Sequence, residues 1–61
     1  MDVATLADLL KEAADRHHSY EESGPEHHWS GWYAAYVNAR GQGSSPEEAA
    51  GAAARYIEGG G

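Results

Sequence analysis

Four histidines form the main group of potential metal ligands in this chain. They lie within twelve positions, with acids among them: His17, His18, His27 and His28, beside Asp15, Glu21, Glu22 and Glu26. Imidazole and carboxylate together can bind zinc, nickel, copper or iron. On a helix, His17 and His18 would each face the glutamate four residues further on. A chain reversal at the intervening Ser-Gly-Pro would bring the later histidines closer, so the candidate ligands are His17, Glu21, His27 and His28.

The spacing of these histidines also has a plain structural interpretation. It matches neither an HExxH motif nor the ExxH pair of di-iron proteins. His17 can end the apolar stripe of a helix, while the other three lie at the surface beside carboxylates. We therefore assign no metal ligand and no cofactor, and keep a transition-metal site (zinc, nickel or iron) as the alternative hypothesis. The chain has no cysteine, which excludes a thiolate metal site and a thiol nucleophile. No serine carries a nucleophile motif, so no catalytic residue is assigned.

An aromatic face is the second group that could carry function. Four of the six aromatic residues fall on two turns of one predicted helix: Trp29, Trp32, Tyr33 and Tyr36. Large aromatic side chains dominate both cores and interfaces, so both roles stay open. One helix cannot direct four such rings into a narrow core. Helical angles place Trp29 near the middle of the face and Trp32 at its edge. We therefore expect Trp29 to be buried, and Trp32 to reach solvent or a partner.

Three helices are predicted to position these groups. In the first, after Asp2 as N-cap, apolar residues recur in steps of three and four, with Leu9 widening the stripe: Val3, Leu6, Leu10, Ala13, His17 and Tyr20. Gly24 and Pro25 end that helix, and Pro25 and Glu26 suit the first turn of the next. The predicted helices therefore span 3–22, 25–40 and 46–58.

The third helix has the strongest local signal in the chain. Ser45-Pro46-Glu47-Glu48 matches a capping box with proline in the first helical position, and the following alanines form an apolar face. No segment shows the alternation typical of a strand. The sequence therefore predicts an all-α fold, a small antiparallel three-helix bundle. Residues 1–58 form its single domain and 59–61 a flexible glycine tail.

The charge of the chain limits the partners it can bind. The formal net charge is −6, and residues 1–28 carry seven acids against two bases, or −5. Nucleic acids and anionic membranes attract clustered lysine and arginine, so neither is expected as a partner. The start of the chain lacks the basic and apolar regions of an export signal, and no stretch is long enough for a membrane span. The sequence therefore favours a soluble cytoplasmic protein.

One stretch resembles segments of known proteins. His27-His28-Trp29-Ser30-Gly31-Trp32-Tyr33-Ala34-Ala35-Tyr36, then Arg40, a glycine-rich turn and Pro46-Glu47-Glu48-Ala49-Ala50, resembles short actinobacterial-type helical segments. Such segments are associated with small glyoxalase or bleomycin-resistance-like proteins, and the likeness covers about residues 6–58. It implies an accessory helical module. The resemblance implies no enzymatic activity for this chain, because the metal chemistry of vicinal-oxygen-chelate enzymes resides in paired βαβββ modules and no strand is predicted here. It also identifies neither His27 nor His28 as a ligand.

Together these features favour a non-enzymatic interaction or accessory module. Its expected partner is a protein or a second copy of the chain, bound through the aromatic face Trp29, Trp32, Tyr33 and Tyr36. The alternative, from a different functional class, is a His/Glu metal-binding protein or the accessory domain of a metalloenzyme.

Overall fold

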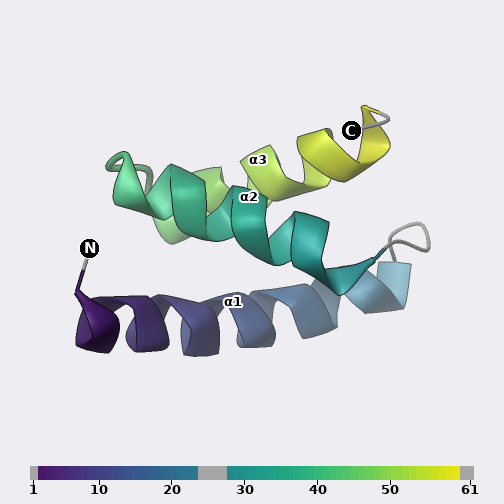
Figure 1. Cartoon of the computed structure of the whole chain (residues 1–61). Helices are drawn as coiled ribbons and strands as arrows, with labels where there is room; N and C mark the ends of the chain where they lie inside the picture. The colour runs from purple at the N-terminus through teal and green to yellow at the C-terminus, as the bar shows by residue number, and fades with distance from the viewer. Residues whose placement is uncertain (1, 24–27, 60–61) are drawn as a thin grey trace.

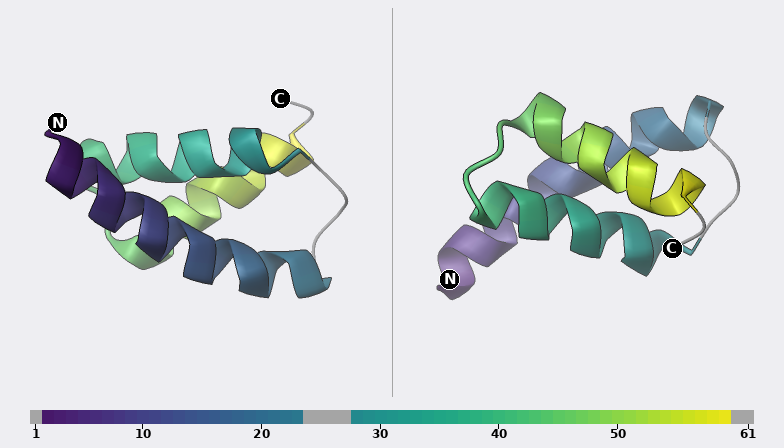
Figure 2. Two further views of the ribbon diagram at one scale, coloured as in Figure 1. Left: turned by 60° about the horizontal axis from the view of Figure 1, so that its bottom comes forward. Right: turned by 90° about the horizontal axis from the view of Figure 1, so that it is seen from above.

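The computed structural model describes residues 2–23 and 28–59, which form three helices in antiparallel succession. These are α1 (Val3–Ser23), α2 (Trp29–Gly41) and α3 (Pro46–Glu58) (Figure 1). Helices α2 and α3 lie side by side, and α1 crosses beneath this pair at an angle (Figure 2). No strand occurs in the described residues, and the predicted all-α three-helix bundle is confirmed. None of these helices is long and apolar enough to cross a membrane.

Side-chain caps fix where α1 and α3 begin. Both oxygens of the Asp2 carboxylate accept hydrogen bonds from Thr5, one from the hydroxyl and one from the backbone N–H. At α3, Ser45 Oγ accepts from the Glu48 backbone N–H at 3.2 Å, and Glu48 Oε1 accepts from the Ser45 N–H at 2.8 Å. This reciprocal pair satisfies two backbone donors that the helix itself leaves unpaired. The predicted bounds of α3 are therefore confirmed, and α1 extends one residue beyond its prediction.

The second helix begins later than predicted. His28 is its N-cap, with extended backbone (ψ 132°), and its Nδ1 accepts from the Ser30 N–H at 3.3 Å. The prediction that this helix runs without interruption from residue 25 was therefore wrong. Residues 25–27 themselves lie outside the described residues. The helix ends at Gly41. In the turn that follows, Gly43 has φ +103°, a conformation that glycine adopts without steric cost.

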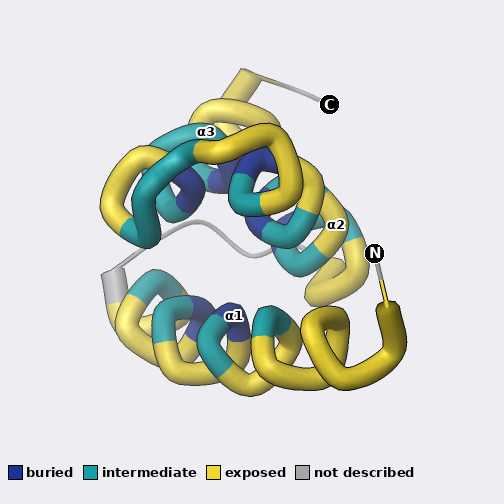
Figure 3. The backbone as a smooth tube through the Cα atoms, turned by 90° about the vertical axis from the view of Figure 1, so that its left-hand side faces the viewer, coloured by how far each residue is buried: buried dark blue, intermediate teal, exposed yellow. Residues whose placement is uncertain are grey.

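The core lies where the three helices face one another (Figure 3). Its fully buried large side chains are Trp32 and Tyr36, both from α2, and the other buried residues are His17 and four alanines: Ala13, Ala39, Ala49 and Ala53. The alanines of α3 let α2 approach closely. Gly31 contributes to this approach, since a Cβ there would lie 3.3 Å from the ring of Tyr56.

Only the second half of the predicted α1 stripe is buried. Ala13 and His17 face the core, whereas Val3 is 82% exposed, Leu6 39% and Leu10 41%. The expectation that these three residues point into the core was wrong, because α1 is longer than α2 and crosses it at an angle (Figure 2). At the other end of the chain, Gly59 caps α3 by donating its N–H to the Arg55 carbonyl at 2.8 Å. It therefore belongs to the helix end, while residues 60–61 of the predicted tail lie outside the described residues.

Candidate functional site

An open groove lies between α1 and α2. Its volume is about 730 Å³ and it is open to solvent. The lining contains no charged side chain: Leu6, Leu10, Trp29, Ser30, Tyr33, Ala34, Val37, Asn38, Gly41 and Gln42. We call this feature the α1–α2 groove. A hollow of this size with apolar walls and a few hydroxyl and amide groups has the chemistry of a binding surface.

Trp29 forms the most exposed aromatic wall of the α1–α2 groove. Its side chain is 60% exposed, yet neighbouring rings hold it in place. The His28 ring stacks on it at a centroid distance of 5.6 Å, and Tyr33 meets it edge-on at 5.6 Å. Such ring pairs each contribute about 0.5–1.5 kcal/mol beyond the area they bury. The groove therefore presents a large aromatic surface that is already ordered before any partner binds.

Two rings of the predicted aromatic face lie in the core. Trp32 is 1% exposed and Tyr36 0%, and their rings stack at 5.2 Å with an interplanar angle of 12°. The expectation that Trp29 is buried and Trp32 exposed was wrong, since the structure reverses the two. Because Trp32 and Tyr36 are shielded within the chain, only Trp29 and the half-buried Tyr33 remain of the predicted interface.

The buried Trp32 also has an unsatisfied polar atom. Its indole N–H is fully buried and makes no hydrogen bond to the described residues. The rings around it are those of His17 at 5.2 Å, Tyr20 at 6.1 Å, Tyr33 at 6.2 Å and the stacked Tyr36. Leaving a buried donor unpaired costs about 1–3 kcal/mol. The apolar and ring contacts of Trp32 must therefore offset this cost, which makes the indole a structural group.

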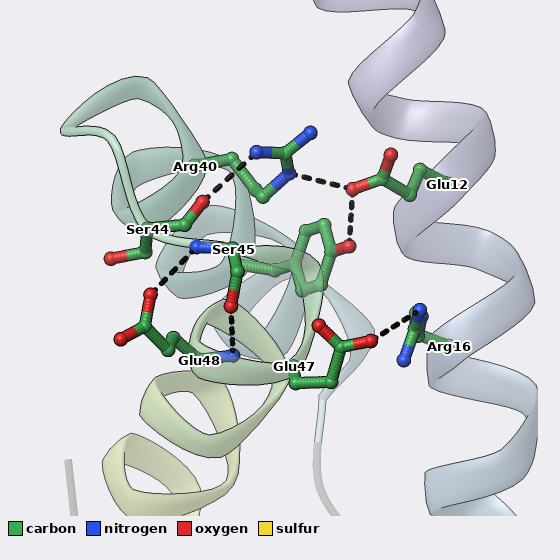
Figure 4. Close-up of polar contacts among 8 residues, drawn as sticks. Glu12, Arg16, Arg40, Ser44, Ser45, Glu47 and Glu48 are labelled. Carbon is green, nitrogen blue, oxygen red and sulfur yellow. Dashed lines mark hydrogen bonds and ion pairs between the residues drawn. The ribbon is translucent and has the colours of Figure 1, made fainter.

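A polar cluster that the sequence did not reveal joins α1 to the α2–α3 turn (Figure 4). The Tyr36 hydroxyl donates a hydrogen bond to Glu12, and Arg40 Nε donates to the same carboxylate oxygen at 2.7 Å. Arg40 Nη1 also donates to the Ser44 carbonyl at 2.9 Å. A second ion pair, Arg16 to Glu47 at 3.7 Å, lies on an exposed edge nearby. These contacts fix how α1 crosses the other two helices.

The same contacts shift the ionisation of the cluster. Hydrogen bonds from Arg40 and then Tyr36 lower the pKa of Glu12 below its ordinary value. Burial, followed by the hydrogen bond to Glu12, raises the pKa of Tyr36 to about 12. The carboxylate and the neutral phenol are thus the stable forms around pH 7. A phenol that holds its proton this tightly is a poor acid. The role of the cluster is therefore structural, since it links α1 to the other two helices.

Among the described residues, the structure brings together two of the predicted metal ligands, His17 and Glu21, and adds no third ligand to them. His17 is buried at 6% exposure, with Nδ1 3.4 Å from Glu21, as its place on the stripe predicted. His18 lies at the exposed surface beside Glu22 at 3.4 Å, and His28 caps α2. Within residues 2–23 and 28–59, no three histidine or acidic side chains gather closely enough to hold a metal ion. The predicted set included His27, which lies outside the described residues.

Which residues of the α1–α2 groove could be predicted depended on the helix. Trp29 and Tyr33 were singled out from their residue types, but Leu6 and Leu10 were assigned to the core. The sequence carried no signal for this difference, because the place of Leu6 and Leu10 in the groove depends on the angle at which α1 crosses α2.

Comparisons with protein-family models, curated proteins and solved structures found no significant match to this chain. The resemblance to glyoxalase-associated segments therefore stays a prediction.

Proposed function

We propose that this chain is a non-enzymatic interaction module that binds a helix of a protein partner in the α1–α2 groove. One observation carries the proposal: of the five large apolar residues that are exposed among the described residues, three line this groove, namely Leu6, Leu10 and Trp29. Apolar surface gathered on one face of a small domain is typical of a protein-binding site.

The shape of the groove suits a helix. Along α2, its lining recurs every four residues over successive turns, at Trp29, Tyr33, Val37 and Gly41. An amphipathic helix seated between two others contacts them through apolar residues at similar spacing. Trp29 is suited to be the main anchor, because tryptophan is enriched among the residues that dominate binding energy.

Charge and composition favour a protein as the partner. With a net charge of −6, the chain would be repelled by nucleic acids and anionic membrane surfaces. A protein helix can bind the uncharged groove without such repulsion. The absence of cysteine suits a reducing compartment, and we place the module in the cytoplasm.

Selection from a displayed library of amphipathic helical peptides tests this function. Peptides enriched on the wild type should share apolar residues at i, i+3 or i+4, and i+7. They should bind Trp29→Ala at least about tenfold more weakly. Tyr56→Ala is the matched control, since Tyr56 is 49% exposed on α3 and lies outside the lining of the α1–α2 groove. Binding that survives loss of Trp29, or no enrichment at all, would contradict the proposal.

A further inference from the structure

We infer that the helix seated in the α1–α2 groove is α1 of a second copy of this chain, in a symmetric dimer. The inference rests on the proposed function and names its partner. In a two-fold arrangement, each copy would place its α1 in the groove of the other.

The first support is that α1 contributes to both surfaces of the proposed contact, the lining of the groove and the helix edge that would bind in it. Val3, Ala7, Leu10 and Ala14 recur in steps of four, three and four, and all four are exposed. They form a continuous apolar edge on α1, and Leu10 of this edge also lines the groove. Leu10 would therefore both line the groove of its own chain and belong to the helix that binds in the groove of the other copy. A surface of this kind is self-complementary, as a two-fold interface requires.

The second support is the distribution of charge. Two copies, each with a net charge of −6, would repel one another unless their acids stay apart. At 100° per residue, Asp8 and Asp15 fall roughly opposite Leu10 on α1. Glu12 is held by Arg40 at 2.7 Å, and the groove lining carries no charge. This face therefore allows two acidic chains to meet without placing carboxylates against each other.

The third support is the area available. The helix from Val3 to Ala14 is about 16 Å long, and a helix with side chains is about 10 Å across. If half of the surface of each such segment is covered by the groove of the other copy, the two segments and the two grooves together bury roughly 1,000 Å². This is the low end for a specific interface, so we expect a dissociation constant on the order of micromolar.

Sedimentation equilibrium over a concentration series tests the dimer. Wild type should dimerise, and Val3→Glu and Trp29→Ala should each weaken it by about tenfold or more. Val3 is 82% exposed, and a glutamate in the first turn favours the helix, so this variant should keep its melting temperature. Tyr56→Ala is the control and should dimerise like wild type. A dimer that neither Val3→Glu nor Trp29→Ala weakens would overturn the inference.

Cross-linking locates the contact, because the chain has no cysteine of its own. Ala7→Cys should form covalent dimers with a short bismaleimide, whereas Asp15→Cys on the far side of α1 should not. The opposite pattern would contradict the pairing of α1 with α1. A wild type that stays monomeric at about 1 mM would also overturn it. If Trp29-dependent peptides are nevertheless selected in that case, the proposed function stands and its partner is a different protein.

Discussion

At the residue scale, two tryptophans three positions apart have opposite roles. Helical angles alone could not assign them, because Trp29 and Tyr36 point in nearly the same direction around α2. Their difference lies along the axis: α2 begins at Trp29, so this ring lies at the end of the helix and packs on His28 and Tyr33. Trp32 lies one turn further on, where it is 1% exposed and packs on His17 and Tyr20 of α1. Which ring is buried therefore depended on where the helix begins.

Alanine at the two tryptophans should separate these roles. Trp32→Ala should cost about 3–5 kcal/mol, the range for deleting a buried aromatic side chain, and this is enough to unfold a small domain. Trp29→Ala should change the free energy of unfolding by much less, because its side chain is 60% exposed. Urea denaturation at a concentration that keeps the protein monomeric measures both. Equal losses would contradict the assignment of Trp32 to the core.

The Tyr36–Glu12 contact should make the fold sensitive to alkali. The pKa of Tyr36 rises from 10 to about 12 on folding, so the folded state holds this proton more tightly than the unfolded state does. The resulting stabilisation is fully present below pH 10 and is lost as the pH rises towards 12.

Comparing the pH dependence of stability in wild type and Tyr36→Phe isolates this effect. The variant should be less stable at neutral pH but should lose less stability between pH 10 and 12. Burial also raises the pKa of Tyr20, so Tyr20→Phe serves as a second control for the remaining slope. Parallel curves for wild type and Tyr36→Phe would show that the phenol ionises freely in the folded state.

At the element scale, local capping chemistry decided which bounds could be predicted. The capping box of Ser45 and Glu48 involves only four consecutive residues, so the start of α3 followed directly from the sequence. The start of α2 did not, because its N-cap is His28, a residue outside the usual capping types, whereas Pro25 offered a familiar start signal. The exposure of Leu6 and Leu10 also escaped prediction, since it depends on the crossing of α1 over α2.

Replacing Ser45 with alanine should destabilise the fold by about 1 kcal/mol, because the Glu48 N–H loses its acceptor at the helix start. Ser44→Ala is a matched control. The backbone carbonyl of Ser44 accepts from Arg40, but its hydroxyl makes no hydrogen bond to the described residues. Thermal or urea unfolding of the two variants should therefore differ. Similar stabilities would mean that the capping box contributes little.

At the scale of the whole molecule, the core and the α1–α2 groove have a common origin. Among the described residues, two large side chains are fully buried, and the other buried apolar residues of the core are alanines. A core this small leaves a short chain marginally stable, while the first turns of α1 keep their apolar residues in solvent. Association through the groove would cover these residues, and the energy gained would add to the stability of the fold.

The most direct test of this account is a dilution series of amide NMR spectra, from about 1 mM to about 10 µM. We predict that the resonances that move with concentration belong to the α1–α2 groove and to the apolar edge of α1, above all to Val3, Leu6, Leu10, Trp29 and Tyr33. Resonances on the outer side of α3, around Arg55 and Tyr56, should stay in place. Shifts centred on α3, or spectra that do not change over the whole range, would contradict self-association through the groove.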